Sequence, residues 1–232
     1  MTSLDFYAKI ESIIGLNEAC DRLYEIFLDE ISSLKFSGFK ALDFGCGNGN
    51  FALKLAKQFS VIGIDKSADM VAQACKKGVD ARCVSLDEIN EKFDLITASF
   101  DVLNYMDKAE LKEFLSKIPN ILNDNGYFIF DINTKFGFSD IANGLLYESD
   151  ENQNHLIIDA KFDGNCLETQ MILFEKSGDK FAKFQNRIIQ FYHKKDEIKK
   201  LLNLKLYRVK ELNLYSDTKA DKLLFVFKKV AK

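Results

Sequence analysis

The stretch ALDFGCGNGN, from Ala41 to Asn50, decides the fold. Its apolar start suits a buried strand, and apolar residues at helical spacing follow its three glycines, Gly45, Gly47 and Gly49. Glycine permits positive φ and removes the Cβ atoms that would keep a ligand away from the backbone. A helix that begins near Asn50 would present free N–H groups to an anion. The stretch therefore predicts a strand, a ligand-binding turn and a helix.

Strands and helices alternate outward from this stretch. Buried strands are expected at 40–44, 61–65, 81–86, 93–99 and 127–132, with helices between them and a turn at 123–126. This alternation predicts a mostly parallel, doubly wound α/β sheet, which binds ligands beyond the carboxyl ends of its strands. The residues expected at those ends are Gly45, Asp65, Ser85, Ser99 and Asp131.

The sequence pattern changes after Asn133, where strand-like runs follow one another without helices between them. Three strand-like runs, 155–163, 166–176 and 181–192, predict an antiparallel meander, and a helix and a closing pair of strands follow. We expect a single domain over 1–232 in four parts. These are an N-terminal helical cap (1–36), a cofactor-binding core (37–135), an antiparallel insert that acts as a lid or dimerisation surface (136–193), and a closing helix and strand pair (194–232).

Composition excludes several classes of function. The net charge of −3 and pI of about 5.6 disfavour nucleic-acid binding. No run of about 18 apolar residues and no apolar leader is present, so we expect a cytoplasmic protein without a membrane span. The five scattered cysteines are expected to be reduced and mostly buried. The two histidines, His155 and His193, exclude a His-rich metal site, and no metal is expected.

Asp65 stands 20 residues after Gly45, at the end of the second expected strand. A carboxylate in this place can accept hydrogen bonds from ribose hydroxyls, so turn and acid together predict an adenosine-bearing cofactor. A dinucleotide fingerprint would have glycine where Asn50 stands, and a P-loop would continue with Gly-Lys-Ser/Thr.

The pattern D-x-G-C-G-x-G resembles motif I of the class I S-adenosylmethionine-dependent methyltransferases. The resemblance continues through VIGIDKSADMVAQA, FDLITASFDVLNYM and NDNGYFIFDINT, and it covers residues 39–135 well. The C-terminal half resembles small-molecule methyltransferases with an antiparallel insert after strand five. The resemblance implies a seven-stranded Rossmann-like sheet of order 3-2-1-4-5-7-6, with the seventh strand antiparallel.

The resemblance also implies contacts to S-adenosylmethionine. Gly45 and Gly47 would line the methionine portion together with Cys46 of the same loop, and Asp43 would support either the loop or the amino group of the methionine portion. Asp65 would bind the ribose, and Lys66 and Met70 would flank the adenine. Ser85 and Leu86 also lie on the adenine side, in the turn after strand three, where many relatives carry an acid. Ser99 and Phe100 would lie under the sulfonium and the acceptor, and Tyr7 would fold over the cofactor.

The reaction implied is methyl transfer to an oxygen or nitrogen of a small-molecule acceptor, with S-adenosylhomocysteine as product. Asp101, Tyr105 and His193 are candidate bases, although His193 is expected on the surface. No Asn-Pro-Pro-Tyr motif follows strand four, which disfavours an amide or exocyclic base nitrogen. Two alternatives remain: a catalytically silent cofactor sensor or partner protein, and an NAD(P)-dependent oxidoreductase, which Asn50 disfavours.

Overall fold

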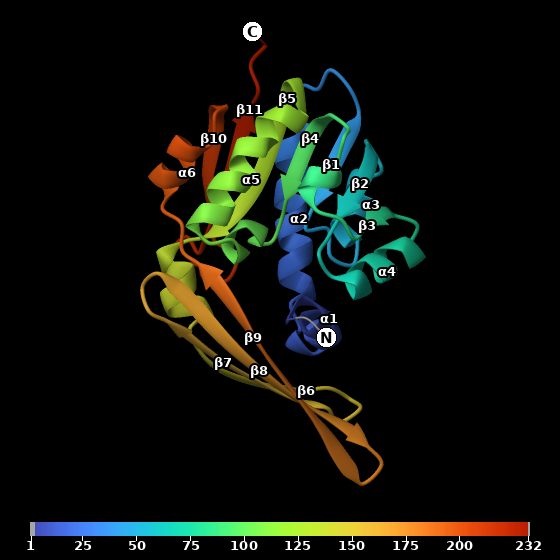
Figure 1. The fold of residues 1–232 in the computed structure, drawn as a ribbon. Coiled ribbons are helices and arrows are strands. Elements are labelled where there is room, and N and C mark those ends of the chain that lie inside the picture. The colour runs from blue at the N-terminus through green and yellow to red at the C-terminus, as the bar shows by residue number, and fades with distance from the viewer. Residues whose placement is uncertain (1–2, 232) are drawn as a thin grey trace.

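A computed structural model describes residues 3–231 and places them in a seven-stranded and a four-stranded sheet (Figure 1). The strands of the larger sheet are β1 (Lys40–Phe44), β2 (Ser60–Ile64), β3 (Asp80–Arg82), β4 (Phe93–Ala98), β5 (Leu122–Asn133), β10 (Lys205–Leu212) and β11 (Lys222–Lys228). Its helices are α2 (Asn17–Ser32), α3 (Asn50–Leu55), α4 (Ala68–Lys76), α5 (Lys108–Ile121) and α6 (Lys195–Leu201). Two short helical turns, η1 (Leu86–Glu88) and η2 (Val102–Tyr105), follow β3 and β4.

The larger sheet has the strand order β3-β2-β1-β4-β5-β11-β10. β1 to β5 are parallel, and β11 is antiparallel to both of its neighbours. Sequence order 3-2-1-4-5-7-6 is therefore confirmed, with β11 as the seventh strand. The five parallel strands end at one edge, which is where a doubly wound sheet binds ligands.

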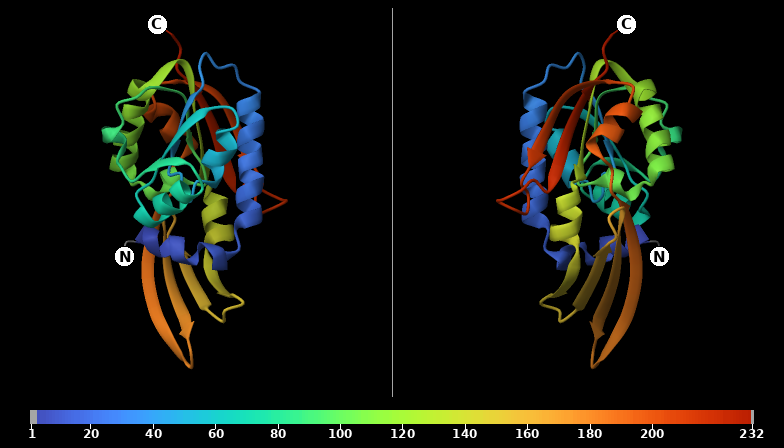
Figure 2. Two further views of the ribbon diagram at one scale, coloured as in Figure 1. Left: turned by 90° about the vertical axis from the view of Figure 1, so that its right-hand side faces the viewer. Right: turned by 90° about the vertical axis from the view of Figure 1, so that its left-hand side faces the viewer.

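Helices cover both faces of this sheet (Figure 2). On one face, α5 packs Phe114 and Ile118 against Phe128, and α6 joins the same apolar cluster. On the other face, α2 and α3 pack against β1, β4 and β5, with Phe27 and Phe51 in edge-to-face contact. The strands are buried on both faces, which explains why they read as continuous apolar runs.

The N-terminal segment forms two helices. α1 (Ser3–Ile14) ends at Gly15, whose φ of +73° turns the chain into α2. α1 lies away from the large sheet and packs Phe6 and Ile10 against Leu156 and Met171 of the insert. The helix therefore joins the core of the molecule to the insert.

The insert is a four-stranded antiparallel sheet, which extends away from the core in Figure 1. Its strands are β6 (Gly144–Ser149), β7 (His155–Phe162), β8 (Cys166–Ser177) and β9 (Lys180–Phe191), and the short helix η3 (Gly137–Ala142) precedes them. β7 to β9 confirm the expected meander, whereas β6 was not expected. β6 is an edge strand with Leu145 and Tyr147 exposed, so it lacks the alternation that marks a half-buried strand.

Two local expectations were wrong. The turn expected at 123–126 lies inside β5, because Asn125 and Gly126 exchange backbone hydrogen bonds with Lys229 next to β11. All five cysteines are free, but only Cys46 is buried, and Cys75 on α4 faces solvent. In the described part of the chain, no helix is long and apolar enough to cross a membrane.

Candidate active site

The glycine turn lies between β1 and α3. Gly45 and Gly47 have φ angles of +72° and +51°, in the left-handed region that favours glycine. A Cβ on Gly45 would lie 2.6 Å from Val102 Cγ2, so the turn approaches η2 too closely for a side chain. A Cβ on Gly47 would meet nothing within 4 Å, because Gly47 borders a cavity.

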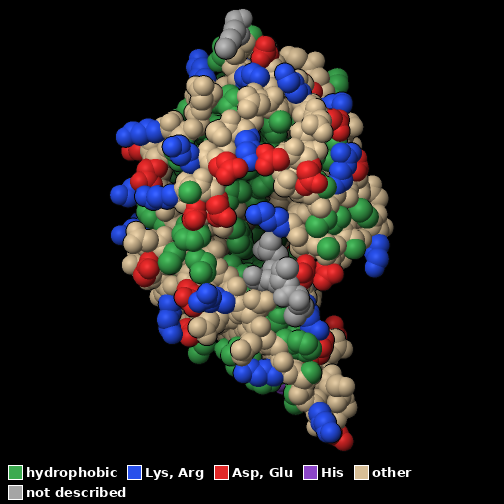
Figure 3. All heavy atoms as spheres, in the orientation of Figure 1, with side chains coloured by type: hydrophobic (Ala, Val, Ile, Leu, Met, Phe, Trp, Pro, Cys, Tyr) green, Lys and Arg blue, Asp and Glu red, His purple; other side chains and the backbone are tan. Residues whose placement is uncertain are grey.

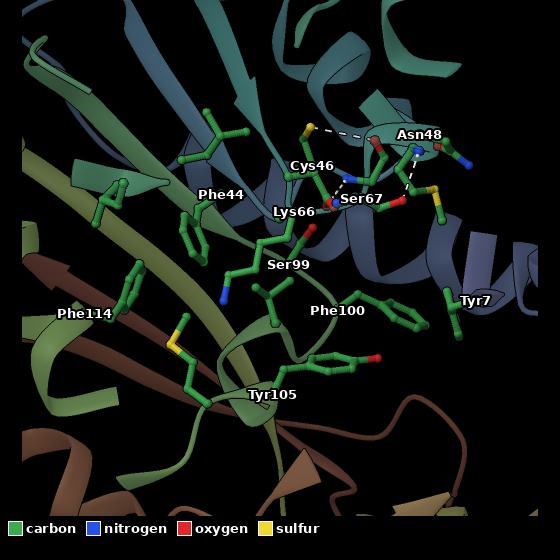
Figure 4. A pocket seen from close by; sticks show the side chains of 18 of the residues that line it. Tyr7, Phe44, Cys46, Asn48, Lys66, Ser67, Ser99, Phe100, Tyr105 and Phe114 are labelled. Carbon is green, nitrogen blue, oxygen red and sulfur yellow. Dashed lines mark hydrogen bonds between the residues drawn. The ribbon is translucent and has the colours of Figure 1, made fainter. Parts of the chain in front are cut away.

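The cavity has a volume of about 350 Å³ and lies at the carboxyl ends of the central strands (Figure 4). Such a volume suits a cofactor or another small molecule. The sequence-predicted residues that line it are Tyr7, Gly45, Cys46, Gly47, Asp65, Lys66, Met70, Ser85, Leu86, Ser99, Phe100 and Tyr105. Among the described residues, none from β6 to β9 lines it.

Asp65 joins the two loops that border the cavity. Its Oδ2 accepts a hydrogen bond from the Gly47 N–H at 2.9 Å, and its Oδ1 accepts one from the Ser67 N–H at 2.8 Å. Ser67 in turn caps α4 by accepting from the Met70 N–H. An ionised carboxylate has about four acceptor sites, so Asp65 can still accept from two hydroxyls.

Asp43 lies beneath the glycine turn and does not line the cavity. Its Oδ1 accepts from the Thr97 hydroxyl at 2.8 Å, whereas its buried Oδ2 has no hydrogen-bond partner among residues 3–231. Burial raises the pKa of Asp43 to about 7, the Thr97 hydrogen bond opposes this rise, and the charge of Asp65 adds to it. Because Asp43 does not line the cavity, we assign it to support of the glycine turn.

The expected adenine side is acidic at its rim. Figure 3 shows a hollow bordered by acidic side chains, and Asp87, Glu110 and Glu113 line this side of the cavity. The Ser85 hydroxyl donates to Glu88 Oε2 at 3.0 Å, so it is engaged within η1. Asp87, which the sequence analysis missed, pairs with Lys117 at 2.8 Å. An acid two positions after Ser85 is the signal that would have identified it.

The N-terminal helices form the remaining wall. Tyr7 and Glu11 come from α1, and Cys20 and Tyr24 come from α2. The Asn48 side-chain amide donates to both Glu11 oxygens, at 3.2 and 3.0 Å, so α1 is bonded directly to the glycine turn. Of these four residues, only Tyr7 was predicted.

We call the region lined by Tyr7, Glu11, Phe100 and Tyr105 the acceptor end. Figure 4 shows Phe100 and Tyr105 on one side of the cavity and Tyr7 facing them from α1. Burial raises the pKa of Tyr7 and of Tyr105 well above the usual value. Tyr105 and Asp101 raise the pKa of Tyr7 further, and the charge of Asp101 raises that of Tyr105. Both hydroxyls are therefore protonated at neutral pH, and Tyr105 is no base there.

The other two candidate bases do not line the cavity. Asp101 is 8 % exposed and bonds to the Lys222 ammonium at 2.6 Å. His193, expected on the surface, is instead 2 % exposed, because it lies between α5 and α6 and donates from Nε2 to the Met106 carbonyl at 3.0 Å. Burial lowers the pKa of His193. Its side chain borders a second, separate cavity.

Comparisons with known proteins agree with this geometry. Residues 41–126 match a family model described as a methyltransferase domain. A putative methyltransferase of Geobacillus sp. (strain WCH70) is 30 % identical over 125 residues, which is 49 % of this chain and 50 % of the relative. A release factor glutamine methyltransferase of Flavobacterium psychrophilum is 30 % identical over 146 residues, 55 % of this chain and 50 % of the relative. The chain thus spans about half the length of these curated relatives.

Solved structures match nearly the whole chain. An S-adenosylmethionine-dependent methyltransferase of Clostridium acetobutylicum superposes with a TM-score of 0.81 at 22 % identity, over 97 % of this chain and 98 % of that one. The sugar N-methyltransferase KedS8 of Streptoalloteichus sp. superposes with a TM-score of 0.73 at 14 % identity, over 94 % and 89 %.

The fold and the matched region agree with each other. The chain has the fold of the class I S-adenosylmethionine-dependent methyltransferases, and its residues 41–126, which include the glycine turn and Asp65, match a methyltransferase domain. The chain also carries an antiparallel insert after β5.

Proposed function

We propose that the protein is an S-adenosylmethionine-dependent methyltransferase that methylates a nitrogen or oxygen of a small molecule. The observation that carries the proposal is a single cavity with two different ends. One end is bordered by Asp65 and the residues of the expected adenine side, and the other is the acceptor end with its aromatic side chains. The glycine turn borders both, because its Asn48 is bonded to Glu11. One cavity can therefore hold a nucleoside cofactor and an acceptor in contact.

The residues present fit the cofactor. The sulfonium of S-adenosylmethionine supplies an already activated methyl group when it is bound. Asp65 has acceptor sites left for ribose hydroxyls, and the open space at Gly47 admits a group close to the backbone. The chain then needs mainly to hold two reactants in line, which can lower a barrier by about 7–11 kcal/mol.

The acceptor end favours an amine nitrogen over an oxygen. Glu11 is its one carboxylate, and Tyr7, Phe100 and Tyr105 offer aromatic faces to a cation. The lysines that line the cavity, Lys66 and Lys117, belong to the expected adenine side among the residues described. An ammonium must lose a proton before it attacks, and Glu11 is the group that we propose to accept it. The amino pentose methyltransferase CalS10 and the sugar N-methyltransferase KedS8 share the fold and are compatible with this acceptor.

Calorimetric titration tests the cofactor. We expect the parent protein to bind S-adenosylmethionine but not NAD(H), and Asp65→Ala to weaken binding while the melting temperature changes little. Asp69→Ala, on the exposed face of α4, is the matched control and should bind as the parent does. Binding of NAD(H) alone, or unchanged affinity in Asp65→Ala, would overturn the proposal.

Turnover to S-adenosylhomocysteine tests the acceptor. D-glucosamine and D-glucose differ at one position, an amine against a hydroxyl, so the pair compares nitrogen with oxygen. We expect turnover with the amine only, and loss of most of that turnover in Glu11→Gln. Cofactor binding without product for any small-molecule acceptor would favour the sensor instead.

A further inference from the structure

The turn after β4 has a backbone that needs support. Phe100 and Asp101 have φ angles of +65° and +53°, so two consecutive residues with side chains adopt the left-handed region. Such residues persist only where their surroundings hold them. Phe100 lines the acceptor end, and Asp101 begins η2. Whatever holds this turn therefore also sets one wall of the cavity.

Asp131, near the end of β5, holds both residues. Its Oδ1 accepts from the Phe100 N–H at 2.6 Å, and its Oδ2 accepts from the Asp101 N–H at 3.0 Å. Successive N–H groups in such a turn form a concave site for an anion. Asp131 is fully buried, so its charge needs a partner.

Lys222, at the start of β11, is that partner. Its ammonium lies 2.9 Å from Asp131 Oδ2 and 2.6 Å from Asp101 Oδ1, and it lies 5.2 Å from the centre of the Phe100 ring. Lys222 is 1 % exposed. Burial alone would lower its pKa, but Asp101 and Asp131 raise it, so the ammonium stays charged.

Two further contacts connect this turn to the insert. Gln190 of β9 donates from its side-chain amide to Asp101 Oδ2. Asn104 of η2 donates to the Phe191 carbonyl at 2.7 Å and accepts from the Asn133 N–H at 2.9 Å. The insert lines none of the cavity among the described residues, yet it is bonded to the turn that does.

We propose that Asp131 and Lys222 are positioning residues that hold the Phe100–Asp101 turn in place as the wall of the acceptor end. The assignment rests on the proposed function, because it gives the turn its role in methyl transfer. Removal of Lys222 would leave Asp101 and Asp131 as two uncompensated carboxylates, and the turn would move to separate them. Asp65 and the glycine turn would keep their geometry, so the effect would fall on the acceptor and not on the cofactor.

Hydrogen exchange tests the turn without any acceptor. In Lys222→Met, the amides of Phe100 and Asp101 should exchange about 10-fold faster or more, while the dissociation constant for S-adenosylmethionine stays within about threefold of the parent value. Lys222→Arg should restore most of the protection because it keeps the charge. Lys228→Met, at the other end of β11, is the matched control and should leave the turn unchanged.

Activity supplies the second readout. With D-glucosamine as the probe, kcat should fall about 10- to 100-fold in Lys222→Met, because a small misplacement of the reacting groups has an effect of this size. Lys222→Arg should recover part of that loss. If the parent protein fails to bind S-adenosylmethionine, the proposed function is wrong. The hydrogen-exchange result would still test whether Lys222 and Asp131 hold the turn, because that measurement needs no ligand.

The double variant Lys222→Met with Asp131→Asn covers the case in which the single variant does not fold. It removes the charges of Lys222 and Asp131 together and leaves one carboxylate, Asp101, in place of two, which a buried cluster of charges tolerates better than loss of Lys222 alone. We expect it to fold with the two amides still unprotected. Protection equal to that of the parent, in either the single or the double variant, would overturn the proposal.

Discussion

Asp43 is a residue whose charge the fold opposes through burial. Its pKa of about 7 means that the folded protein retains a proton which the unfolded chain releases near pH 4. The free energy of unfolding therefore falls as the pH rises from about 4 to about 7, and the whole penalty is present above pH 7.

Asp43→Asn removes this dependence. Relative to the parent, the variant should gain about 2–3 kcal/mol more stability at pH 8 than at pH 5, because only the parent must ionise a buried carboxyl. Urea unfolding at the two pH values measures the difference. Asp179→Asn, in the exposed turn between β8 and β9, should show no such gain. An equal effect of Asp43→Asn at both pH values would contradict the shifted pKa.

Gly47 is the position where a side chain should affect binding more than folding. Gly47→Val would place its branches in the open space of the cavity, and we expect affinity for S-adenosylmethionine to fall about 100-fold or more, equivalent to about 2.7 kcal/mol. The left-handed φ adds a stability cost of roughly 1–2 kcal/mol. Gly178→Val, at a φ of +61° with no atom near its Cβ, shares that cost and should bind normally. Calorimetry distinguishes the two, and equal binding by both variants would place the cofactor elsewhere.

At the scale of single residues, the sequence predicted those site residues whose positions follow from local spacing along the chain. Gly45, Gly47 and Asp65 occupy positions that the turn and strand end impose, and they border the cavity as expected. Glu11 and Lys222 were missed, because their partners are distant in the chain. Lys222 lies 91 positions from Asp131, and no local pattern relates two such residues.

The elements of the core were predictable because burial on both faces leaves long apolar runs. β1, β2, β4 and β5 carried this signal strongly. β6 did not, since its residues are exposed and only pairing with β7 makes them a strand. The 123–126 segment has the composition of a turn, but pairing next to β11 overrides that preference.

Helix α1 is the element that we expect to control access to the cavity. Phe6 is fully buried against the insert, so Phe6→Ala should weaken docking of α1 by about 3–5 kcal/mol. S-adenosylmethionine should then dissociate faster, and proteases should cut more readily between α1 and α2. Stopped-flow dissociation and limited proteolysis measure these effects. Tyr207→Ala, a half-exposed aromatic on β10, should leave both rates unchanged.

At the scale of the whole molecule, the insert presents one covered and one open face. Leu156 and Leu173 face α1, whereas Tyr147, Ile157 and Ile172 pair across the strands on the opposite face. Tyr147 and Phe181 on that face are 58 % and 49 % exposed. Exposed apolar side chains gathered in this way are typical of interaction surfaces, so the homodimer through residues 136–193 stays a prediction.

Sedimentation at several protein concentrations tests the homodimer. The parent should associate as concentration rises, and Tyr147→Lys with Phe181→Lys should shift it to the monomer. Phe39→Lys changes an aromatic that is 72 % exposed in the segment between α2 and β1, outside the insert, and should associate as the parent does. A monomer at every concentration would make the prediction wrong.

The position of α1 also bears on the order of events in a catalytic cycle. The helix packs on the insert through Phe6 and Ile10 and is bonded to the glycine turn through Glu11. A nucleoside between this helix and the strand ends leaves only after both attachments loosen. We therefore expect a sequential mechanism in which the spent nucleoside departs last, and its departure limits the overall rate.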